Sequence, residues 1–202
     1  DMYNNYAVIG EPWWSEHSGR VLLVKSASAG NSWGDATILE TGKQATDEFG
    51  SDVAISGEWL VASAPRANEP YIMIFRSDGQ GYVKHSELTR DDVPGFDVRN
   101  TAFGAWIDLR SQWMVIGSPS EYYVGKAFVF KYVDSARKWE LFQSLEAPSR
   151  VGNSQDTKSF GSSVALRTNR LFVSAPGSSA SHGTVFEYAF NAHDEWSLVA
   201  VL

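Results

Sequence analysis

Short runs of apolar residues recur along the chain, and many of them alternate with polar positions before a turn-forming residue ends the run. Between Phe128 and Val133, aromatic residues at even positions alternate with Val129, Lys131 and Val133 at odd positions. A period of two in short segments bounded by Gly, Pro, Asn and Ser is typical of β-strands. No window of a dozen residues carries a helical stripe, so the pattern predicts an all-β chain.

The strand pattern is organised in copies of one unit. The phrase FGSDVAI begins at Phe49 and returns as FGAWIDL at Phe103 and FGSSVAL at Phe160, with spacings of 54 (103 − 49) and 57 (160 − 103) residues. A second phrase, a strand-like run that ends in a small residue and proline, follows each of these and also occurs near the start. Its four prolines are Pro12, Pro65, Pro119 and Pro176.

Each copy continues with an apolar run and then with an aromatic residue that begins the last strand. These aromatic residues are Trp33, Tyr82, Trp139 and Trp196. Each unit therefore contains four antiparallel strands, which is the composition of a β-propeller blade. A blade of this size cannot bury both faces of its sheet alone, so we expect it to stack on neighbouring blades.

The copies divide the chain into four repeats. We place repeat 1 at residues 1–48, without its first strand, and the others at residues 49–102, 103–159 and 160–202. Together they predict one propeller domain or a segment of one. An open arc of about four blades leaves apolar faces and strand edges exposed. We therefore expect the repeats to form part of a larger propeller, or to complete a ring with a second polypeptide.

The repeated phrases resemble the FG-GAP repeat, which is best known from the integrin α-subunit propeller. The residues that carry the resemblance are Phe49, Gly50, Phe103, Gly104, Phe160 and Gly161 with the four prolines Pro12, Pro65, Pro119 and Pro176. We expect structural roles for them: Phe packs between blades, Gly lets the backbone turn sharply, and Pro ends the second strand. Calcium-binding members carry an acidic loop between the first two strands. The corresponding turns here hold a single carboxylate, Glu58, so we do not transfer the calcium sites.

Composition narrows the range of partners. The chain has 202 residues, a formal net charge of −7 and no cysteine. A net negative charge does not attract the phosphate backbone of nucleic acid or an anionic membrane surface, so we expect neither nucleic acid binding nor direct membrane insertion. No apolar run approaches the roughly 20 residues that span a bilayer. We expect no cofactor.

Two groups of residues are candidates for a functional site. Asp91, Asp92 and Asp97 form the most acidic stretch and are a weak candidate for a cation site, although Asp residues beside Pro–Gly also form ordinary turns. The loops after the proline corners are unusually aromatic, and loops on a rigid scaffold often carry binding sites. The candidate binding residues in these loops are Trp13, Trp14, His17, Tyr122, Tyr123 and His182.

No catalytic constellation of nucleophile, base and orienting acid is visible, so we expect the chain not to be an enzyme. The leading hypothesis is a protein-interaction, adhesion or structural scaffold module, extracellular or on the cell surface, as the resemblance implies. Its partner is a protein or the remaining blades of a longer chain. The alternative is a carbohydrate-binding or carbohydrate-active propeller, such as a lectin, lyase or hydrolase, whose aromatic loops stack on a sugar.

Overall fold

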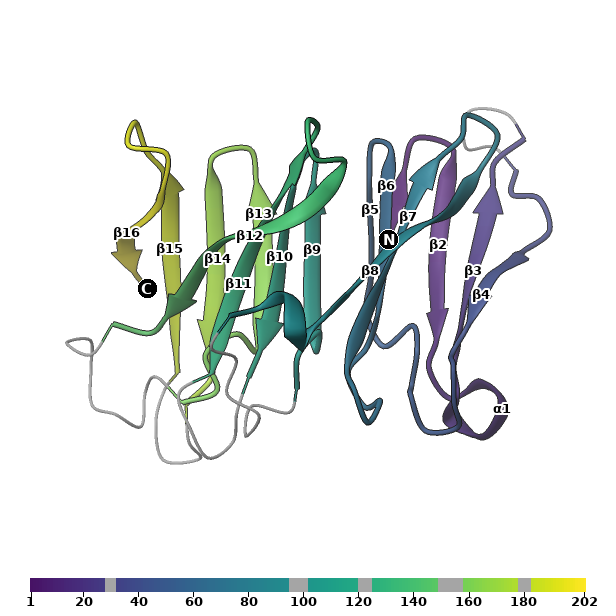
Figure 1. Cartoon of the computed structure of the whole chain (residues 1–202), viewed down its shortest axis with the longest axis horizontal. Coiled ribbons are helices and arrows are strands. Elements are labelled where there is room, and N and C mark those ends of the chain that lie inside the picture. The colour runs from purple at the N-terminus through teal and green to yellow at the C-terminus, as the bar shows by residue number, and fades with distance from the viewer. Residues whose placement is uncertain (28–31, 95–101, 120–124, 149–157, 178–182) are drawn as a thin grey trace. The chain divides into compact units, whose positions relative to one another are not determined.

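A computed structural model describes residues 1–27, 32–94, 102–119, 125–148, 158–177 and 183–202 (Figure 1). The described residues form four antiparallel sheets of four strands each, which we call blades 1 to 4 in chain order. Blade 1 contains β1 (Met2–Tyr3), β2 (Tyr6–Glu11), β3 (Arg20–Lys25) and β4 (Thr37–Thr41), and blade 2 contains β5 (Val53–Ser56), β6 (Trp59–Ala64), β7 (Tyr71–Ser77) and β8 (Tyr82–Thr89). Blade 3 contains β9 (Trp106–Arg110), β10 (Trp113–Ser118), β11 (Lys126–Val133) and β12 (Lys138–Glu146), and blade 4 contains β13 (Ser163–Arg167), β14 (Arg170–Ala175), β15 (Thr184–Phe190) and β16 (Trp196–Val201). This architecture confirms the predicted fold class, an all-β chain of four-stranded blades.

The helical segments are short. The segment α1 (Trp14–His17) follows the first proline corner, and a 3₁₀ helix, η1 (Arg90–Asp92), follows β8. Within the described ranges, none of the helices has the length and apolar character needed to cross a membrane.

Blade 1 contains a strand before Tyr6, although the sequence predicted that repeat 1 lacks its first strand. The two-residue strand β1 pairs with the start of β2, with Met2 opposite Ala7 and Tyr3 opposite Tyr6. The sequence phrase that marks the first strand elsewhere, Phe–Gly followed by alternating residues, is missing here. The strand is therefore defined by its backbone pairing and not by a side-chain pattern.

A hairpin at residues 77–81 joins β7 to β8. Asp78 accepts hydrogen bonds from the backbone N–H groups of Gln80 (2.9 Å) and Gly81 (2.8 Å), and these two donors lower the pKa of its carboxyl group. Gly79 has a φ of 89°, a conformation that glycine adopts without steric cost. The turn residues thus fix the register of the two longest strands of blade 2.

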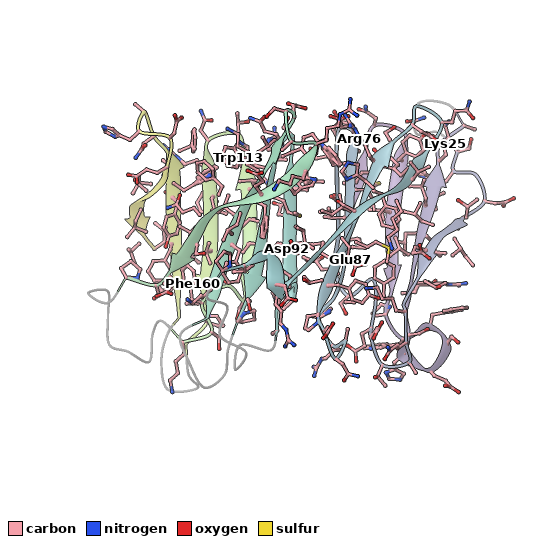
Figure 2. All side chains as sticks on the ribbon, in the orientation of Figure 1. Lys25, Arg76, Glu87, Asp92, Trp113 and Phe160 are labelled. Carbon is pink, nitrogen blue, oxygen red and sulfur yellow. The ribbon has the colours of Figure 1, made fainter. Side chains whose placement is uncertain are left out.

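The chain divides into two compact units, residues 1–91 and residues 92–202, and each unit contains two blades. In the first unit, side chains of blade 1 such as Val8, Val21 and Leu23 pack with Phe49, Leu60 and Met73. In the second unit, Val115 and Val129 of blade 3 pack with Phe160, Val173 and Phe186 (Figure 2 labels Phe160). Each unit is thus two sheets that bury their facing apolar side chains against each other.

The Phe–Gly motifs lie at the start of blades 2, 3 and 4. The side chains of Phe49, Phe103 and Phe160 are fully buried, and Gly50, Gly104 and Gly161 have φ values of 87°, 83° and 90°. The four prolines follow directly after β2, β6, β10 and β14. Pro12, Pro65, Pro119 and Pro176 therefore each stand where the second strand of a blade ends.

Candidate functional site

The loop after Pro12 has an unusual backbone. Ser15, Glu16 and His17 are three consecutive residues with positive φ, at 46°, 57° and 63°. Non-glycine residues rarely adopt this left-handed conformation, because the Cβ atom crowds the backbone, and they persist only where the surrounding structure holds them. Strain of this kind is concentrated at functional sites, so the loop is the first candidate for one.

A second loop holds the first in place. The backbone N–H groups of Gly42, Thr46, Glu48 and Phe49 donate to the carbonyl oxygens of Gly19 (2.9 Å), Glu16 (3.2 Å), His17 (2.8 Å) and Ser18 (3.0 Å). Two of these four donors, Thr46 and Glu48, have positive φ themselves. We call residues 13–19 and 42–49 the double loop. The four backbone hydrogen bonds hold the two segments side by side.

The double loop exposes two tryptophan side chains to different degrees. Trp13 is 74% exposed, the largest fraction of any large hydrophobic residue in the described part of the chain. Trp14 is 37% exposed, and the Arg20 guanidinium lies 4.9 Å from the centroid of its ring. Arg20 also pairs with Glu11 at 2.5 Å. Trp14 is therefore held against the blade, whereas Trp13 projects into solvent.

Glu48 of the double loop lies near two basic side chains. Glu48 lies 4.0 Å from the Nδ1 atom of His17 and 3.7 Å from the Nε atom of Arg66, which comes from the loop after Pro65. The side chains of His17 and Arg66 are 59% and 74% exposed. The double loop therefore presents exposed tryptophan together with a partly buried carboxylate and exposed basic side chains.

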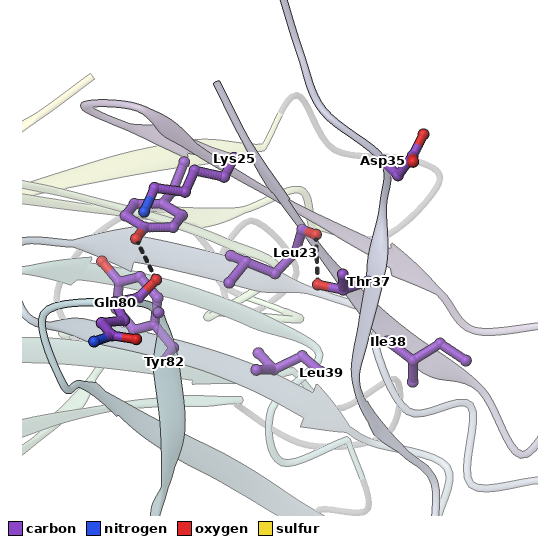
Figure 3. Close-up of a pocket in the computed structure, with 10 residues that line it drawn as sticks. Leu23, Lys25, Asp35, Thr37, Ile38, Leu39, Gln80 and Tyr82 are labelled. Atoms are coloured by element: carbon purple, nitrogen blue, oxygen red, sulfur yellow. Dashed lines mark hydrogen bonds between the residues drawn. The ribbon is translucent and has the colours of Figure 1, made fainter. Parts of the chain in front are cut away.

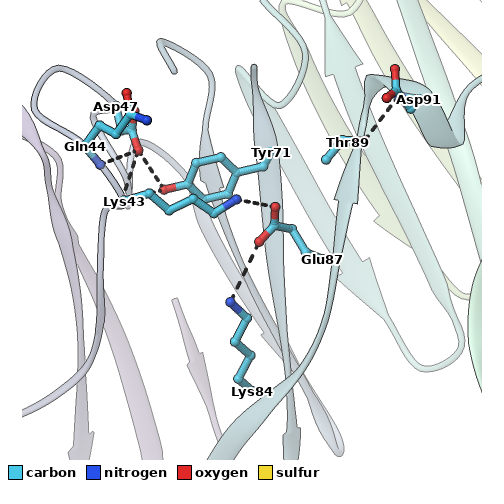
Figure 4. Close-up of polar contacts among 8 residues, drawn as sticks. All are labelled: Lys43, Gln44, Asp47, Tyr71, Lys84, Glu87, Thr89 and Asp91. Atoms are coloured by element: carbon cyan, nitrogen blue, oxygen red, sulfur yellow. Dashed lines mark hydrogen bonds and ion pairs between the residues drawn. The ribbon is translucent and has the colours of Figure 1, made fainter. Parts of the chain in front are cut away.

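A buried polar network holds residues 42–49 of the double loop in place (Figure 4). The Asp47 carboxylate, which is only 3% exposed, accepts hydrogen bonds from the backbone N–H groups of Lys43 (3.1 Å) and Gln44 (3.0 Å) and from the Tyr71 hydroxyl (3.1 Å). The Lys43 ammonium lies 4.0 Å from the centroid of the Tyr71 ring and pairs with Glu87. A buried carboxylate needs such donors, and here they tie the loop to blade 2.

Burial raises the pKa of the Tyr71 hydroxyl well above its usual value. The nearby negative charges of Asp47 and Glu87 act in the same direction, while the backbone N–H of Lys43 opposes them. Tyr71 is consequently protonated at neutral pH and serves as a hydrogen-bond donor to Asp47. Its role in this network is to hold the loop.

A pocket of about 470 Å³ opens between blade 1 and the β7–β8 hairpin of the same unit (Figure 3). The rings of Tyr6 and Tyr82 meet edge to face in its wall, with centroids 5.5 Å apart. The Tyr6 hydroxyl donates to the carbonyl oxygen of Gln80 (2.9 Å), and the Tyr82 hydroxyl donates to that of Gly57 (2.8 Å). Both hydroxyls are thus engaged, and burial raises the pKa of Tyr82 to about 12.

The rest of the lining combines apolar and polar groups. Leu23, Ile38 and Leu39 contribute apolar surface, while Lys25 and Asp35 contribute one charge of each sign. The Lys25 ammonium lies 5.4 Å from the centroid of the Tyr6 ring. The pocket is therefore suited to a small group with an apolar face and not to a bare ion.

The structure brings together only some of the residues named from the sequence. Trp13, Trp14 and His17 share the double loop, as described above. Tyr122, Tyr123 and His182 lie outside the described residues, and so does Asp97 of the acidic stretch. Asp91 and Asp92 belong to η1, where the Asp91 backbone N–H donates to the Thr89 hydroxyl (3.2 Å). Where the chain is described, no group of three or more metal-binding side chains occurs.

Several important residues were not predicted from the sequence. Asp47, Tyr71 and Arg66 support or border the double loop, and Tyr6 and Lys25 line the pocket, although none of them belongs to a recognisable motif. The closest available signal was the aromatic residue at the start of each last strand, which includes Tyr82. Its contact with Tyr6, however, joins positions 76 residues apart (82 − 6).

Comparison with protein families identifies one repeat directly. Residues 33–83 match the FG-GAP repeat. The matched segment includes β4 and β5 to β7, with Phe49, Gly50 and Pro65. The chain thus carries an FG-GAP repeat, and its four sheets have the form of propeller blades.

Two solved structures have a similar fold. A protein from Lactobacillus plantarum superposes with a TM-score of 0.63 at 17% identity, covering 99% of this chain and 53% of that one. The sialidase of Trypanosoma rangeli, solved in complex with the inhibitor DANA, superposes with a TM-score of 0.55 at 9% identity, covering 96% of this chain and 36% of the sialidase. At these identities the likeness shows the fold alone, that of propeller blades.

One curated protein has detectable sequence similarity. The diacylglycerol acyltransferase/mycolyltransferase Ag85B of Mycobacterium intracellulare is 28% identical over 188 residues, which is 85% of this chain and 53% of that protein. The chain spans about half the length of this relative and of the Lactobacillus protein, and about a third of the sialidase.

Proposed function

Starting from the FG-GAP repeat and the four blades, we propose that this chain is a non-enzymatic protein-interaction module and that its contact surface is the double loop. The observation that carries the proposal is Trp13, which is 74% exposed on a loop fixed by four backbone hydrogen bonds. An exposed tryptophan leaves a large apolar surface in water, and a rigid loop loses little entropy when that surface is covered.

The surroundings of Trp13 support binding to a protein surface. Residues that dominate protein interfaces are most often Trp, Tyr and Arg, and they are placed centrally with polar groups around them. Here Trp13 and Trp14 share the double loop with His17 and Glu48, and Arg66 lies 3.7 Å from the Glu48 carboxylate. A rim with both signs of charge favours a partner of complementary pattern and not a uniformly charged polymer.

A carbohydrate ligand is the second candidate, because a flat exposed indole beside carboxylate and guanidinium groups also suits a sugar ring. The observation in its favour is again Trp13, with Glu48 and Arg66 nearby as hydrogen-bonding groups. A glycan array therefore belongs in the same test.

The test uses three forms of the chain: the natural sequence, Trp13→Ala and the control Trp106→Ala. Trp106 is 47% exposed on β9 and lies in the other unit, so its removal changes surface tryptophan content but not the double loop. Proteins that the natural chain captures from an extract of its source are identified, purified and titrated by calorimetry.

We expect at least one purified partner to lose about thirtyfold in affinity with Trp13→Ala, as for a central interface residue, and to bind Trp106→Ala normally. Affinities that are equal for all three forms contradict the proposal. Array binding to a glycan that disappears only with Trp13→Ala assigns the double loop to carbohydrate instead.

A further inference from the structure

The two units build the same cleft between their blades. In the first unit, Tyr6 of β2 stands opposite Lys25 of β3, and in the second, Trp113 of β10 stands opposite Lys131 of β11. On the other side of the cleft, Tyr82 stands opposite Ser77 in the first unit, and Trp196 stands opposite Phe190 in the second. The strand registers thus give each of these four positions in one unit a counterpart in the other.

In the second unit, aromatic side chains fill this cleft (Figure 2 labels Trp113). Trp113 contacts Phe142, Phe190 and Trp196 with ring centroids at 4.9, 5.2 and 5.8 Å. The Lys131 ammonium lies 5.1 Å from the Trp113 ring and 5.8 Å from the Phe142 ring. The four rings and one cation form a closed cluster.

A glutamine completes the second unit's cluster. The side chain of Gln143 donates to the carbonyl oxygen of Trp196 (2.9 Å) and accepts from its backbone N–H (2.8 Å). Gln143 stands opposite Val129 on β11, and the residue in the corresponding register of the first unit is Thr37, opposite Leu23. The threonine hydroxyl bonds instead to the Leu23 carbonyl oxygen within its own blade (3.1 Å).

The first unit lacks the two phenylalanines. Ser77 occupies the position of Phe190, because Ser77 pairs with Tyr82 as Phe190 pairs with Trp196. Of the ring contacts described for the second unit, the first unit retains the Tyr6–Tyr82 pair. The pocket of about 470 Å³ is lined by Tyr6, Lys25, Thr37 and Tyr82, the counterparts of Trp113, Lys131, Gln143 and Trp196. Part of its volume therefore corresponds to aromatic side chains that the second unit supplies from its own sequence.

We propose that this pocket binds one aromatic side chain, tryptophan before tyrosine or phenylalanine, from a protein partner. The proposal rests on the protein-interaction function proposed above and adds a second contact point to it. The guest ring would take the place of Phe142 and Phe190, against the ring of Tyr6 and the apolar surface of Leu23 and Leu39.

The side chain of Lys25 provides the selectivity. Lys131 covers two rings in the second unit, and Lys25 already lies 5.4 Å from the centroid of Tyr6, so it is placed to cover a guest ring in the same way. A cation above a ring is attracted most strongly by the indole of tryptophan. This contact favours an aromatic guest over an aliphatic side chain of similar area.

The probe is N-acetyl-L-tryptophanamide, a blocked single residue, with N-acetyl-L-leucinamide as the aliphatic comparison. Binding is followed by the chemical shifts of the 202-residue chain in NMR spectra. We expect the tryptophan probe to shift signals of Tyr6, Leu23 and Tyr82, and to bind more tightly than the leucine probe.

Three variants decide the assignment. Ser77→Phe introduces the residue of the second unit and should abolish binding of the probe. Lys25→Met keeps the stem and removes the charge, and should weaken binding about two- to fivefold, whereas the matched control Lys131→Met in the filled cleft should leave binding unchanged. Each variant is first checked for retained dispersion of its NMR signals.

Failure of the two proposals can be distinguished. Trp13→Ala should leave probe binding unchanged, because the double loop is not part of the pocket lining. No shift at the pocket signals, or equal binding by Ser77→Phe and the natural chain, overturns the pocket proposal and leaves the double loop untouched. Tighter binding of free indole-3-acetate than of the blocked residue also overturns it, since the pocket would then serve a small molecule.

Discussion

The blade contacts inside the two units are built from the same parts. In the first unit, the Asp1 carboxylate accepts a hydrogen bond from the backbone N–H of Ile55 (3.0 Å), and in the second, the Asp108 carboxylate accepts one from Leu166 (2.6 Å). Both acceptors come from the first blade of the unit, and both donors lie on the first strand of the next. In each unit an aspartate thus accepts a hydrogen bond from a backbone N–H of an edge strand.

The close approach of the two backbones is also repeated. A Cβ atom added to Gly10 would lie 2.0 Å from the carbonyl oxygen of Gly50, and one added to Gly117 would lie 2.2 Å from that of Gly161. The second blade of each unit carries serine at the corresponding position, Ser63 and Ser174. Glycine in the first blade of each unit and serine in the second indicate that the sequence repeats in pairs of blades as well as in single blades.

The units differ in what surrounds this shared contact. The first unit has the polar network of Asp47 and Tyr71, the double loop and the pocket, and the second has the closed aromatic cluster around Trp113. An aromatic cluster contributes packing, whereas an exposed tryptophan and an unfilled cleft contribute nothing to folding. We infer that the second unit is specialised for stability and the first for contact.

The largest effect is expected from the buried phenylalanines. Phe49→Ala should destabilise the first unit by about 3–5 kcal/mol and Phe160→Ala the second by a similar amount, because each removes a fully buried ring between two sheets. Hydrogen exchange measured by mass spectrometry should show lost protection in the unit that carries the change. Equal loss of protection in both units for either variant would contradict the division into two units.

The next largest effect tests the close approach of the backbones. Gly10→Ala and Gly117→Ala should each cost about 3 kcal/mol, the upper end of the range for overpacking, because the added methyl group meets a carbonyl that cannot move alone. Gly81→Ala is the control, since nothing lies within 4 Å of its Cβ position. Urea denaturation followed by tryptophan fluorescence measures all three. If Gly81→Ala lowered the free energy of unfolding as much as Gly10→Ala, the close backbone contact would not explain the effect.

Much of the fold could be predicted from the sequence because the repeats carry local signals. Alternation of apolar residues marks the strands, and the Phe–Gly and proline phrases mark where each blade begins and where its second strand ends. The hairpin at Asp78–Gly81 was predictable for the same reason, since its turn residues act on their own neighbours. The two-residue strand β1 has no such signal and was not predicted.

The division into pairs of blades was visible in the sequence but was not recognised. Gly10 and Gly117 alternate with Ser63 and Ser174, and the position of Asp108 in blade 3 is occupied by Ala54 in blade 2 and Ala165 in blade 4. The site was harder to predict, because Asp47 with Tyr71 and Tyr6 with Tyr82 are contacts between distant segments. Only the exposed position of Trp13 and Trp14 followed from their place in a loop.

Removal of the aspartate contact should have a smaller effect. Asp108→Ala should cost about 1.5–3 kcal/mol, the range for a hydrogen bond to a charged group, because the Leu166 N–H loses its acceptor. Asp108→Asn should cost less, since one amide oxygen can still accept. Hydrogen exchange at Leu166, measured by NMR, reports the contact directly. Unchanged exchange at Leu166 in Asp108→Ala would show that the bond does not protect the strand edge.

The smallest loss of stability is expected from changes to the buried tyrosines. Their ionisation should destabilise the two units at different pH values. Tyr71→Phe should cost about 1 kcal/mol at neutral pH, because Asp47 keeps two backbone donors. A tyrosine whose pKa is raised by folding contributes stability that is complete below the unfolded pKa, about 10, and is lost as the pH rises toward the folded value. Tyr71 and Tyr82 of the first unit have raised pKa values, with Tyr82 at about 12, and in the second unit burial raises the pKa of Tyr188 to about 12.

The first unit should therefore become susceptible to limited proteolysis at a lower pH than the second, within the window from about pH 10 to pH 12. Mass spectrometry of the fragments locates the cuts made by a protease that is active at alkaline pH. Tyr71→Phe removes the ionising hydroxyl and should reduce the pH dependence of the first unit, whereas Tyr188→Phe should act only on the second. If the first cleavages at high pH fell within residues 92–202, the second unit would be the less stable one. The aromatic cluster, and not the polar network, would then be the weaker contact.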